Sequence, residues 1–216
     1  MVHNLGLGNS IINQFISEIR DTSIQQDRMR FRRNLERTGE IFAYEISKEL
    51  AYENSEVTTP LGSAIVPVLK EQPIVATILR AGLPLHQGIL NYFDQADNGF
   101  ISAYRKHHKD GSFEIKLEYV SCPSIEDRVL ILCDPMLATG ASMVSTYKAM
   151  LEMGKPRHTH IVSVLASTQG VEHLKAQLPM ERISIWAAAI DEELTAQSYI
   201  VPGLGDAGDL AYGKKL

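Results

Sequence analysis

The sequence has few cysteines, no excess of positive charge and no long apolar segment. Its two cysteines, Cys122 and Cys133, lack the spacing of a metal site or of a disulfide framework. Cys133 ends an apolar run, which predicts a buried thiol. No apolar run approaches the ~20 residues that a helix needs to cross a bilayer. The segment of residues 1–8 is too short for the apolar part of a signal peptide, because the polar Asn9 and Ser10 follow at once. These absences predict a cytoplasmic protein with no membrane partner.

The net charge and the absence of certain motifs argue against further classes of protein. The formal net charge is −5. Sequence-independent binding of nucleic acid needs a basic face, so no nucleic-acid partner is expected. The chain contains neither the GxxxxGK[ST] phosphate loop nor the GxSxG nucleophile motif. His158 and His160 can share one face of a strand, but no third ligand follows at a recognisable spacing. We therefore expect no metal ion held by protein ligands.

The N-terminal region, about residues 10–50, has the pattern of two helices. Asn9 and Ser10 are N-cap candidates for a helix from Ile11 to about Arg20. A longer helix is expected to reach about Leu50. Its apolar residues recur at four- and seven-residue intervals and therefore share one face: Phe31, Leu35, Phe42, Ile46 and Leu50. The basic run at its start fits a solvated face or a subunit contact, with an anion site as the alternative: Arg28, Arg30, Arg32 and Arg33.

The remainder alternates strand and helix patterns. Buried strands are expected at residues 74–79, 129–133, 161–166 and 183–190, and helices from Pro84 to about Tyr92 and from about Ser142 to Met153, closed by Gly154. Apolar and charged residues alternate over residues 113–119, and Asp110-Gly111 suits a tight turn. Together they predict a β-hairpin over about residues 100–120. This order predicts one α/β domain over residues 1–216, with a mostly parallel central sheet flanked by helices. Ligands bind such sheets beyond the carboxyl ends of the strands.

The loop after the strand at 129–133 has the chemistry of a phosphate cradle. Thr139, Gly140, Ala141 and Ser142 are small and stand where a helix begins, so their backbone N–H groups can face an anion. Asp134, at the strand end, would repel phosphate and suits sugar hydroxyls instead. An N-capped helix after a tight turn explains the same residues equally well.

The same segment resembles a known motif. VLILC followed by Asp134-Pro135 and MLATGAS is similar to the phosphoribosyl-pyrophosphate motif of uracil phosphoribosyltransferases, a type I phosphoribosyltransferase family. The family usually has two adjacent glycines where this chain has Gly140-Ala141. Alanine costs little there if its φ is negative and more if the loop needs a positive φ. The resemblance implies that the donor is bound by Asp134, Pro135, Met136, Leu137, Ala138, Thr139, Gly140, Ala141 and Ser142.

Two arginines extend the resemblance. Ile78 to Leu83 (ILRAGL) is similar to the family's strand-to-helix turn that holds pyrophosphate, which often carries a non-proline cis peptide. The guanidinium of Arg80 suits that role because its rigid fork matches phosphate oxygens. The alternative is a surface arginine after a buried strand. Arg105, on the first strand of the hairpin, is similar to a second pyrophosphate-binding arginine, and the alternative for it is a solvated charge.

The third match is the stretch Tyr199 to Asp209 (YIVPGLGDAGD). Read literally it contains GxGxxG, but a dinucleotide site also needs an acidic residue about 20 positions further on, and the chain ends first. The stretch resembles the family's uracil loop. The resemblance implies that Ile200, Gly205 and Ala207 meet the base and that Asp206 meets the phosphoribosyl donor. Backbone amides complement the flat edge of uracil and discriminate among bases.

The resemblance implies an activity. A uracil phosphoribosyltransferase joins uracil to phosphoribosyl pyrophosphate, giving uridine monophosphate and pyrophosphate in pyrimidine salvage. Arg105 and Asp206 would be the catalytic residues, and Mg²⁺ would sit mainly on donor oxygens and water. A homodimer or homotetramer is expected. Two alternatives stay open: a phosphoribosyltransferase for another base, and a regulator of the same fold that binds pyrimidine nucleotides and RNA.

Overall fold

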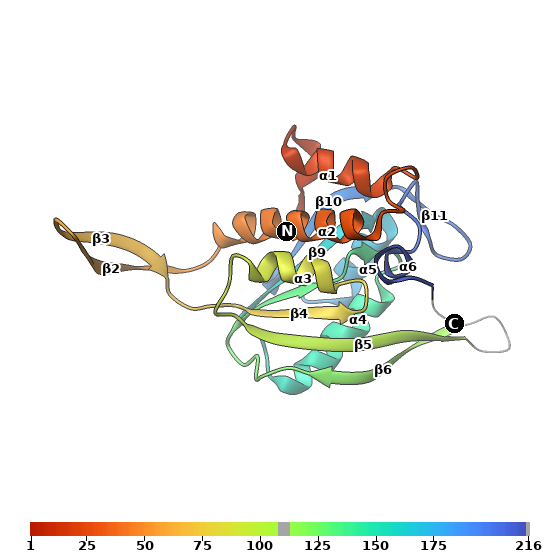
Figure 1. Cartoon of the computed structure of the whole chain (residues 1–216). Helices are drawn as coiled ribbons and strands as arrows, with labels where there is room; N and C mark the ends of the chain where they lie inside the picture. Colours follow the sequence, from red (N-terminus) through yellow and green to blue (C-terminus); the bar gives the residue numbers. More distant parts are fainter. Residues whose placement is uncertain (108–112, 215–216) are drawn as a thin grey trace.

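The computed structural model describes residues 1–107 and 113–214, without the side chains of residues 103–117. Its centre is an eight-stranded sheet in the order β1-β10-β9-β7-β4-β5-β6, with β8 also pairing with β9 (Figure 1). The pairs are parallel except for antiparallel β5–β6. The strands are β1 Val2–Asn4, β4 Ile74–Leu79, β5 Asp97–His107, β6 Phe113–Ser121, β7 Val129–Cys133, β8 Met136–Leu137, β9 His158–Ser167 and β10 Ile183–Asp191.

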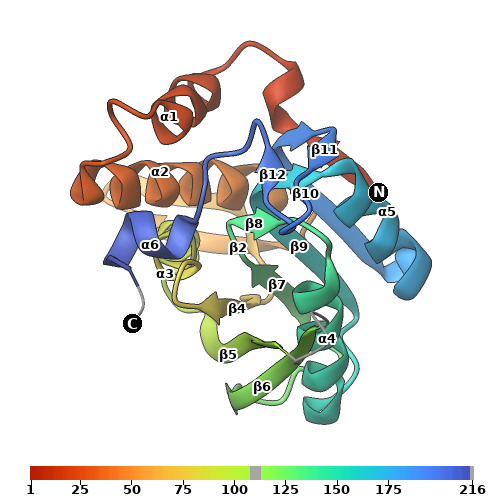
Figure 2. The same cartoon turned by 90° about the vertical axis from the view of Figure 1, so that its right-hand side faces the viewer.

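Helices cover both faces of this sheet. One face is covered by α1 Ile11–Arg20, α2 Arg28–Ser47 and α3 Leu83–Leu90, and the other by α4 Ala141–Met150 and α5 Thr168–Gln177 (Figure 2). Short 3-10 turns lie at η1 Leu5–Leu7, η2 Leu151–Met153 and η3 Met180–Arg182, and the chain ends in β11 Glu193–Leu194, β12 Ile200–Val201 and α6 Ala207–Tyr212. The predicted α/β class, with its mostly parallel sheet, is confirmed.

The two cores follow from the alternation of side chains along buried strands. On β4, Val75 packs in the core beneath α1 to α3, whereas Ile74 and Ala76 pack in the core beneath α4 and α5. Both faces are covered, which is why these strands are continuous apolar runs. On α2 the predicted apolar face is confirmed for Phe31, Leu35, Phe42 and Ile46, which are buried. Leu50 lies beyond the end of α2 and is half-buried.

Several sequence predictions need adjustment at element ends. The long helix ends at Ser47 rather than about Leu50, and α3 spans 83–90 rather than 84–92. The expected helix to Met153 becomes α4 followed by η2, with Gly154 after it at φ +125. Asp110-Gly111 lies outside the described residues. In the described part of the chain no helix combines the length and apolarity of a bilayer span.

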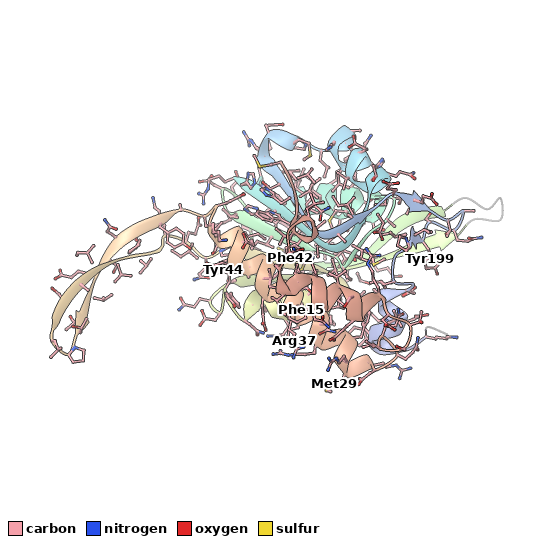
Figure 3. All side chains as sticks on the ribbon, turned by 90° about the horizontal axis from the view of Figure 1, so that it is seen from above. Phe15, Met29, Arg37, Phe42, Tyr44 and Tyr199 are labelled. Carbon is pink, nitrogen blue, oxygen red and sulfur yellow. The ribbon has the colours of Figure 1, made fainter. Side chains whose placement is uncertain are left out.

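Several parts of the fold were not predicted from the sequence, among them three that lie outside the lining of the cleft described below. β1 pairs with β10 at the sheet edge, and α5 packs behind the loop that follows β7. The third is an antiparallel ribbon, β2 Tyr52–Thr59 with β3 Gly62–Leu69, that forms a separate two-stranded sheet. This ribbon projects from the end of the molecule opposite the C-terminal loops (Figure 1, Figure 3).

Candidate active-site cleft

The three sequence motifs converge on one cleft. Its volume is about 670 Å³, and it lies at the carboxyl ends of β4 and β7, where the chain after β10 crosses the sheet edge (Figure 2). The lining residues come from the turn after β4, the loop after β7 and the C-terminal segment: Ile78, Leu79, Arg80, Ala81, Asp134, Met136, Ala138, Ser142, Gln197, Ser198, Tyr199, Ile200, Gly205, Asp206, Ala207 and Gly208. This is the position that a parallel α/β sheet uses for ligands.

The loop after β7 forms a small hollow at the start of α4. Gly140 is the N-cap of α4 and has φ +78, whereas Ala141 begins the helix. The first-turn N–H groups of a helix have no intrahelical acceptor, and Thr139 Oγ1 accepts from Ala141 N at 3.4 Å. The hollow, about 30 Å³, is lined by residues 134–143 except Pro135 and Ala141. The positive φ falls on Gly140, so alanine at 141 does not strain the loop.

Neighbouring strands hold this loop from behind. Ser167 Oγ donates to Ala138 O at 2.6 Å, and Ser163 Oγ donates to Asp134 O at 2.7 Å. A Cβ on Gly170, in the first turn of α5, would lie 2.8 Å from Leu137 O. The carboxylate of Asp134 accepts from Met136 N at 3.2 Å. The loop is therefore rigidly seated on β9 and α5.

The turn after β4 presents Arg80 to the cleft. The Leu79–Arg80 peptide bond is cis, as the resemblance implied. The guanidinium Nη2 donates to Gly213 O at 3.3 Å and lies 3.7 Å from Asp209 Oδ1. Its Nε is buried and has no hydrogen-bond partner among the described residues. Such a donor has bonding capacity left for an anion.

The C-terminal segment places backbone groups and one carboxylate at the cleft. The Val201–Pro202 bond is cis, and Gly203 and Gly205 have φ +57 and +95. Ile200 and Ala207 are buried. Asp206 is exposed and caps α6, its Oδ1 accepting from Asp209 N at 2.9 Å. The predicted positions of the uracil loop therefore line the cleft together.

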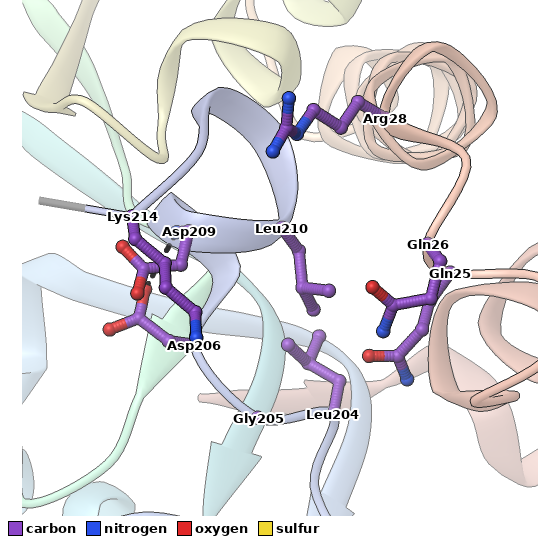
Figure 4. Close-up of a pocket in the computed structure, with 9 residues that line it drawn as sticks. All are labelled: Gln25, Gln26, Arg28, Leu204, Gly205, Asp206, Asp209, Leu210 and Lys214. Carbon is purple, nitrogen blue, oxygen red and sulfur yellow. Dashed lines mark hydrogen bonds between the residues drawn. The ribbon is translucent and has the colours of Figure 1, made fainter.

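A second pocket of about 380 Å³ borders the same segment. It lies between the α1–α2 connection and α6 and shares Gly205 and Asp206 with the cleft. Figure 4 shows Gln25 and Gln26 facing Leu204 and Leu210 across it.

The basic run at the start of α2 is mostly paired within the chain. Arg30 binds Glu18 bidentately at 2.8 and 2.9 Å, and Arg33 lies 2.6 Å from Glu36. Arg32 donates to Ala211 O at 2.7 Å and so holds α6.

The remaining residues that the sequence analysis named do not line the cleft, or their side chains lie outside the described residues. Arg105 belongs to β5, but its side chain is outside the described residues. Cys133 is fully buried, which confirms the predicted buried thiol. This burial raises the pKa of the thiol to about 12. His160 accepts from Trp186 Nε1 at 3.0 Å, and burial lowers its pKa to about 3. His158 Nε2 lies 3.0 Å from Ser184 Oγ.

Sequence reasoning did not single out two lining residues. Gln197 and Ser198 belong to the turn between β11 and β12, and Ser198 has φ +65. Neither residue type carries a sequence signal for that conformation. Their place at the cleft follows from the pairing of β11 with β12.

Solved structures similar to this chain support the fold. The AQ2163 protein of Aquifex aeolicus superimposes with a TM-score of 0.87 at 29% identity, covering 99% of this chain and 98% of that one. The orotate phosphoribosyltransferase of Mycobacterium tuberculosis H37Rv gives a TM-score of 0.51 at 12% identity, over 87% and 94% of the two chains. The second likeness concerns the fold alone.

Sequence comparisons cover the chain almost end to end. It is 54% identical, over 100% of its length and 99% of the relative's, to a uracil phosphoribosyltransferase of Porphyromonas gingivalis. It is 36% identical to that of Thermococcus gammatolerans, over 95% and 90% of the two chains. The family model described as uracil phosphoribosyltransferase matches residues 7–214. The chain therefore belongs to the uracil phosphoribosyltransferase family.

Proposed function

We propose that the chain transfers the phosphoribosyl group of phosphoribosyl pyrophosphate to uracil, giving uridine monophosphate and pyrophosphate. The observation that carries the proposal is the cleft of about 670 Å³ in which all three motifs meet. Two of these motifs lie at the carboxyl ends of neighbouring strands, β4 and β7, and the third contains β12. The proposal takes residues 1–216 as one domain, because both cores lie against the same sheet.

Each wall of the cleft suits one part of the substrates. Thr139, Gly140 and Ser142 line a hollow of about 30 Å³ at the start of α4, where free backbone N–H groups would suit the 5′-phosphate of the donor. Arg80, whose Nε has no hydrogen-bond partner among the described residues, suits the pyrophosphate. Asp134 suits the ribose hydroxyls, since a carboxylate accepts hydrogen bonds and repels phosphate. The rest of the donor-binding set is Pro135, Met136, Leu137 and Ala138.

The base would lie against the C-terminal segment. Ile200, Gly205 and Ala207 line this side of the cleft, and their main-chain groups would pair with the carbonyl and N–H groups of uracil. A base whose edge presents a different order of donors and acceptors would leave buried backbone groups unpaired. The segment therefore favours uracil over other bases.

Catalysis in such a cleft rests on placement and charge. The bond from the ribose C1 carbon to pyrophosphate breaks, its electron pair leaves with pyrophosphate, and uracil N1 forms the new bond and loses its proton. Arg80 and Arg105 would stabilise the departing charge. Asp206 is exposed at the cleft, where its carboxylate can orient the donor or accept the N1 proton. Holding base and sugar in line supplies the remaining advantage.

We also propose Mg²⁺ as the cofactor, bound mainly through the oxygens of the donor and water. The cleft fits this hard cation, because the nearby carboxylates of Asp134 and Asp206 are oxygen ligands of the kind that Mg²⁺ accepts directly or through water. When bound, Mg²⁺ would neutralise part of the pyrophosphate charge.

We further propose a homodimer or homotetramer, built in part on the β2–β3 ribbon. A two-stranded ribbon alone is marginally stable in water. It nonetheless carries exposed apolar side chains, among them Leu61 in its turn, which is fully exposed, and Ile65, which is 65% exposed. The ribbon projects away from the body (Figure 3). An exposed apolar surface of this kind fits a second copy of the chain. Light scattering would find a dimer or larger for the wild type and a shift to monomer for Ile65→Asp. An unchanged mass would remove the ribbon from the interface.

The deciding experiment is a pyrophosphate-release assay with phosphoribosyl pyrophosphate, Mg²⁺ and a panel of uracil, cytosine, thymine, hypoxanthine and orotate. We expect turnover with uracil alone, and a loss of about 10²-fold or more in Arg80→Ala, the usual cost of losing one charge-stabilising donor. Arg157→Ala is the matched control, since Arg157 pairs with Glu71 outside the cleft. Turnover with another base would reassign the acceptor. Tight donor binding without turnover would favour the nucleotide-binding regulator.

A further inference from the structure

An arginine on the first helix contacts the C-terminal loop. Arg20, the last residue of α1, donates through Nη1 to Gly203 O at 3.0 Å. The same guanidinium binds Asp191, at the end of β10, through Nη2–Oδ1 at 2.7 Å and Nη1–Oδ2 at 2.8 Å. Asp191 Oδ2 in turn accepts from Gly203 N at 3.0 Å. Both backbone groups of Gly203 are therefore bound by one ion pair, which we call the Arg20–Asp191 clamp.

The burial of the clamp makes these bonds strong. The side chain of Asp191 is 9% exposed and that of Arg20 23% exposed. A bidentate guanidinium–carboxylate pair is geometrically rigid, and its bonds gain strength where water is scarce. Neither residue lines the cleft or the second pocket, so any effect on substrate acts through Gly203.

Gly203 lies between the residues that we propose to meet the base. A Cβ at Gly203 would come 2.8 Å from the carbonyl carbon of Ile200, so its backbone packs on that residue. Two residues further on, Gly205 has φ +95 and open space where a Cβ would be. Gly205 is exposed and, as a glycine, has no side chain that packing could hold in place. The clamp, two residues upstream, supplies the restraint.

The same strand ends hold the phosphate loop. Asp191 pairs in register with Ser167 on β9, and Ser167 Oγ donates to Ala138 O at 2.6 Å. Asp191 O accepts from Thr168 Oγ1 at 3.4 Å. The ends of β9 and β10 therefore set the distance between the base-facing loop and the phosphate-facing loop.

We infer that Arg20 and Asp191 are positioning residues for the acceptor base: the clamp fixes Gly203 and thereby aligns the backbone of Ile200 and Gly205 with uracil. This inference rests on the proposed function. The clamp touches the base loop directly, so its loss acts on uracil more than on the donor.

The chain offers a matched control. Arg30 and Glu18 form a second bidentate pair, at 2.8 and 2.9 Å, which joins α1 to α2 without touching the C-terminal loop. The carboxylate of Glu18 is 10% exposed, close to the value for Asp191. Loss of either pair loosens α1, but only loss of the Arg20–Asp191 clamp frees Gly203.

The test compares Arg20→Met/Asp191→Asn with Arg30→Met/Glu18→Gln, pairs in which no buried charge is left alone. We expect the clamp variant to raise the KM for uracil about 10- to 100-fold, the scale of a misplaced binding group, with the KM for the donor changed less than about threefold. The control variant should change neither KM beyond about threefold. Arg20→Lys, which keeps the charge but loses the fork, should fall between.

Equal effects of the clamp and control variants on the KM for uracil, or equal rises in both KM values, would overturn the inference. If the clamp double variant does not fold, the comparison of Arg20→Lys with Arg30→Lys decides.

Calorimetric binding of uridine monophosphate separates the clamp proposal from the proposed function. A wild type that binds it without turnover would refute the proposed reaction, and the loss of that binding in the clamp variants would still test the clamp. A wild type that neither turns over nor binds it would refute both.

Discussion

Gly140 connects the geometry of the phosphate loop with the energetics of the fold. It has φ +78 and ψ −10 at the start of α4. A Cβ added there would lie 2.8 Å from Leu174 Cδ1, 2.9 Å from Gly170 O and 3.3 Å from His173 Cδ2. The Leu174 side chain can rotate away, but the carbonyl of Gly170 belongs to the first turn of α5 and cannot. In Gly140→Ala, the phosphate loop must therefore move.

The stability that Gly140→Ala loses has two causes. The left-handed conformation costs a residue with a Cβ about 1–2 kcal/mol, and crowding a packed site costs a further ~1–3 kcal/mol. A loss of roughly 2–5 kcal/mol is tolerable only because folded domains hold about 5–15 kcal/mol of stability. We expect Gly140→Ala to fold, with a lower urea midpoint. Its KM for phosphoribosyl pyrophosphate should rise about 10²-fold, because the N–H groups leave their positions.

The control for general destabilisation is Gly154→Ala. Gly154 has φ +125 and ψ 178, a conformation nearly restricted to glycine, and its Cβ would lie 2.7 Å from Glu126 N, so an alanine there also meets backbone strain and crowding, beyond the far end of α4. Unfolding is followed by the fluorescence of Trp186, the sole tryptophan, and donor affinity by pyrophosphate release. Similar stability losses with a donor KM changed only in Gly140→Ala would support the cradle. An unchanged donor KM in a folded Gly140→Ala would refute it.

Three more outcomes follow from single residues. Gly205→Ala meets backbone strain but no crowding. In steady-state kinetics it should therefore raise the KM for uracil several-fold more than the KM for the donor. A larger rise in the KM for the donor would show that the base lies elsewhere. Asp206→Asn keeps an N-cap of similar quality for α6 and removes the charge. Its urea midpoint should therefore hold while kcat falls about 10- to 100-fold, and an unchanged kcat would remove Asp206 from the chemistry. Hydrogen bonds from Arg30, Asn34 and Gln14 lower the pKa of Glu18 to about 2 from 4.5, so the ionised carboxylate stabilises the fold above about pH 4.5 and this stabilisation is lost as the pH falls towards 2. Glu18→Gln should therefore be less stable than the wild type at pH 7, with the gap closing by pH 2 in fluorescence-monitored unfolding, and a constant gap would contradict the linkage.

Local patterns in the sequence predicted the elements whose signals are local. Ile74–Leu79 and Val129–Cys133 are confirmed as strands at their predicted bounds, and Ile11–Arg20 as a helix. Buried strands are continuous apolar runs, and short-range periodicity determines one helix face. The family resemblance came from three short motifs in order, and the comparisons confirm the family.

Only the tertiary structure decided which residues support the cleft. α5 carries no strong local signal, yet Gly170 packs against Leu137 and Ala138 behind the phosphate loop. The β2–β3 ribbon was missed because sequence patterns assign apolar strands to a core. The apolar residues of this ribbon are exposed instead.

The Arg20–Asp191 clamp illustrates the physical reason. Its two residues lie 171 positions apart in the chain, and neither belongs to a motif. The sequence determined the chemical groups that face the substrates, because short segments of the backbone present them. The fold decided what holds those segments in register, because that depends on strand order and on ion pairs between residues distant in sequence.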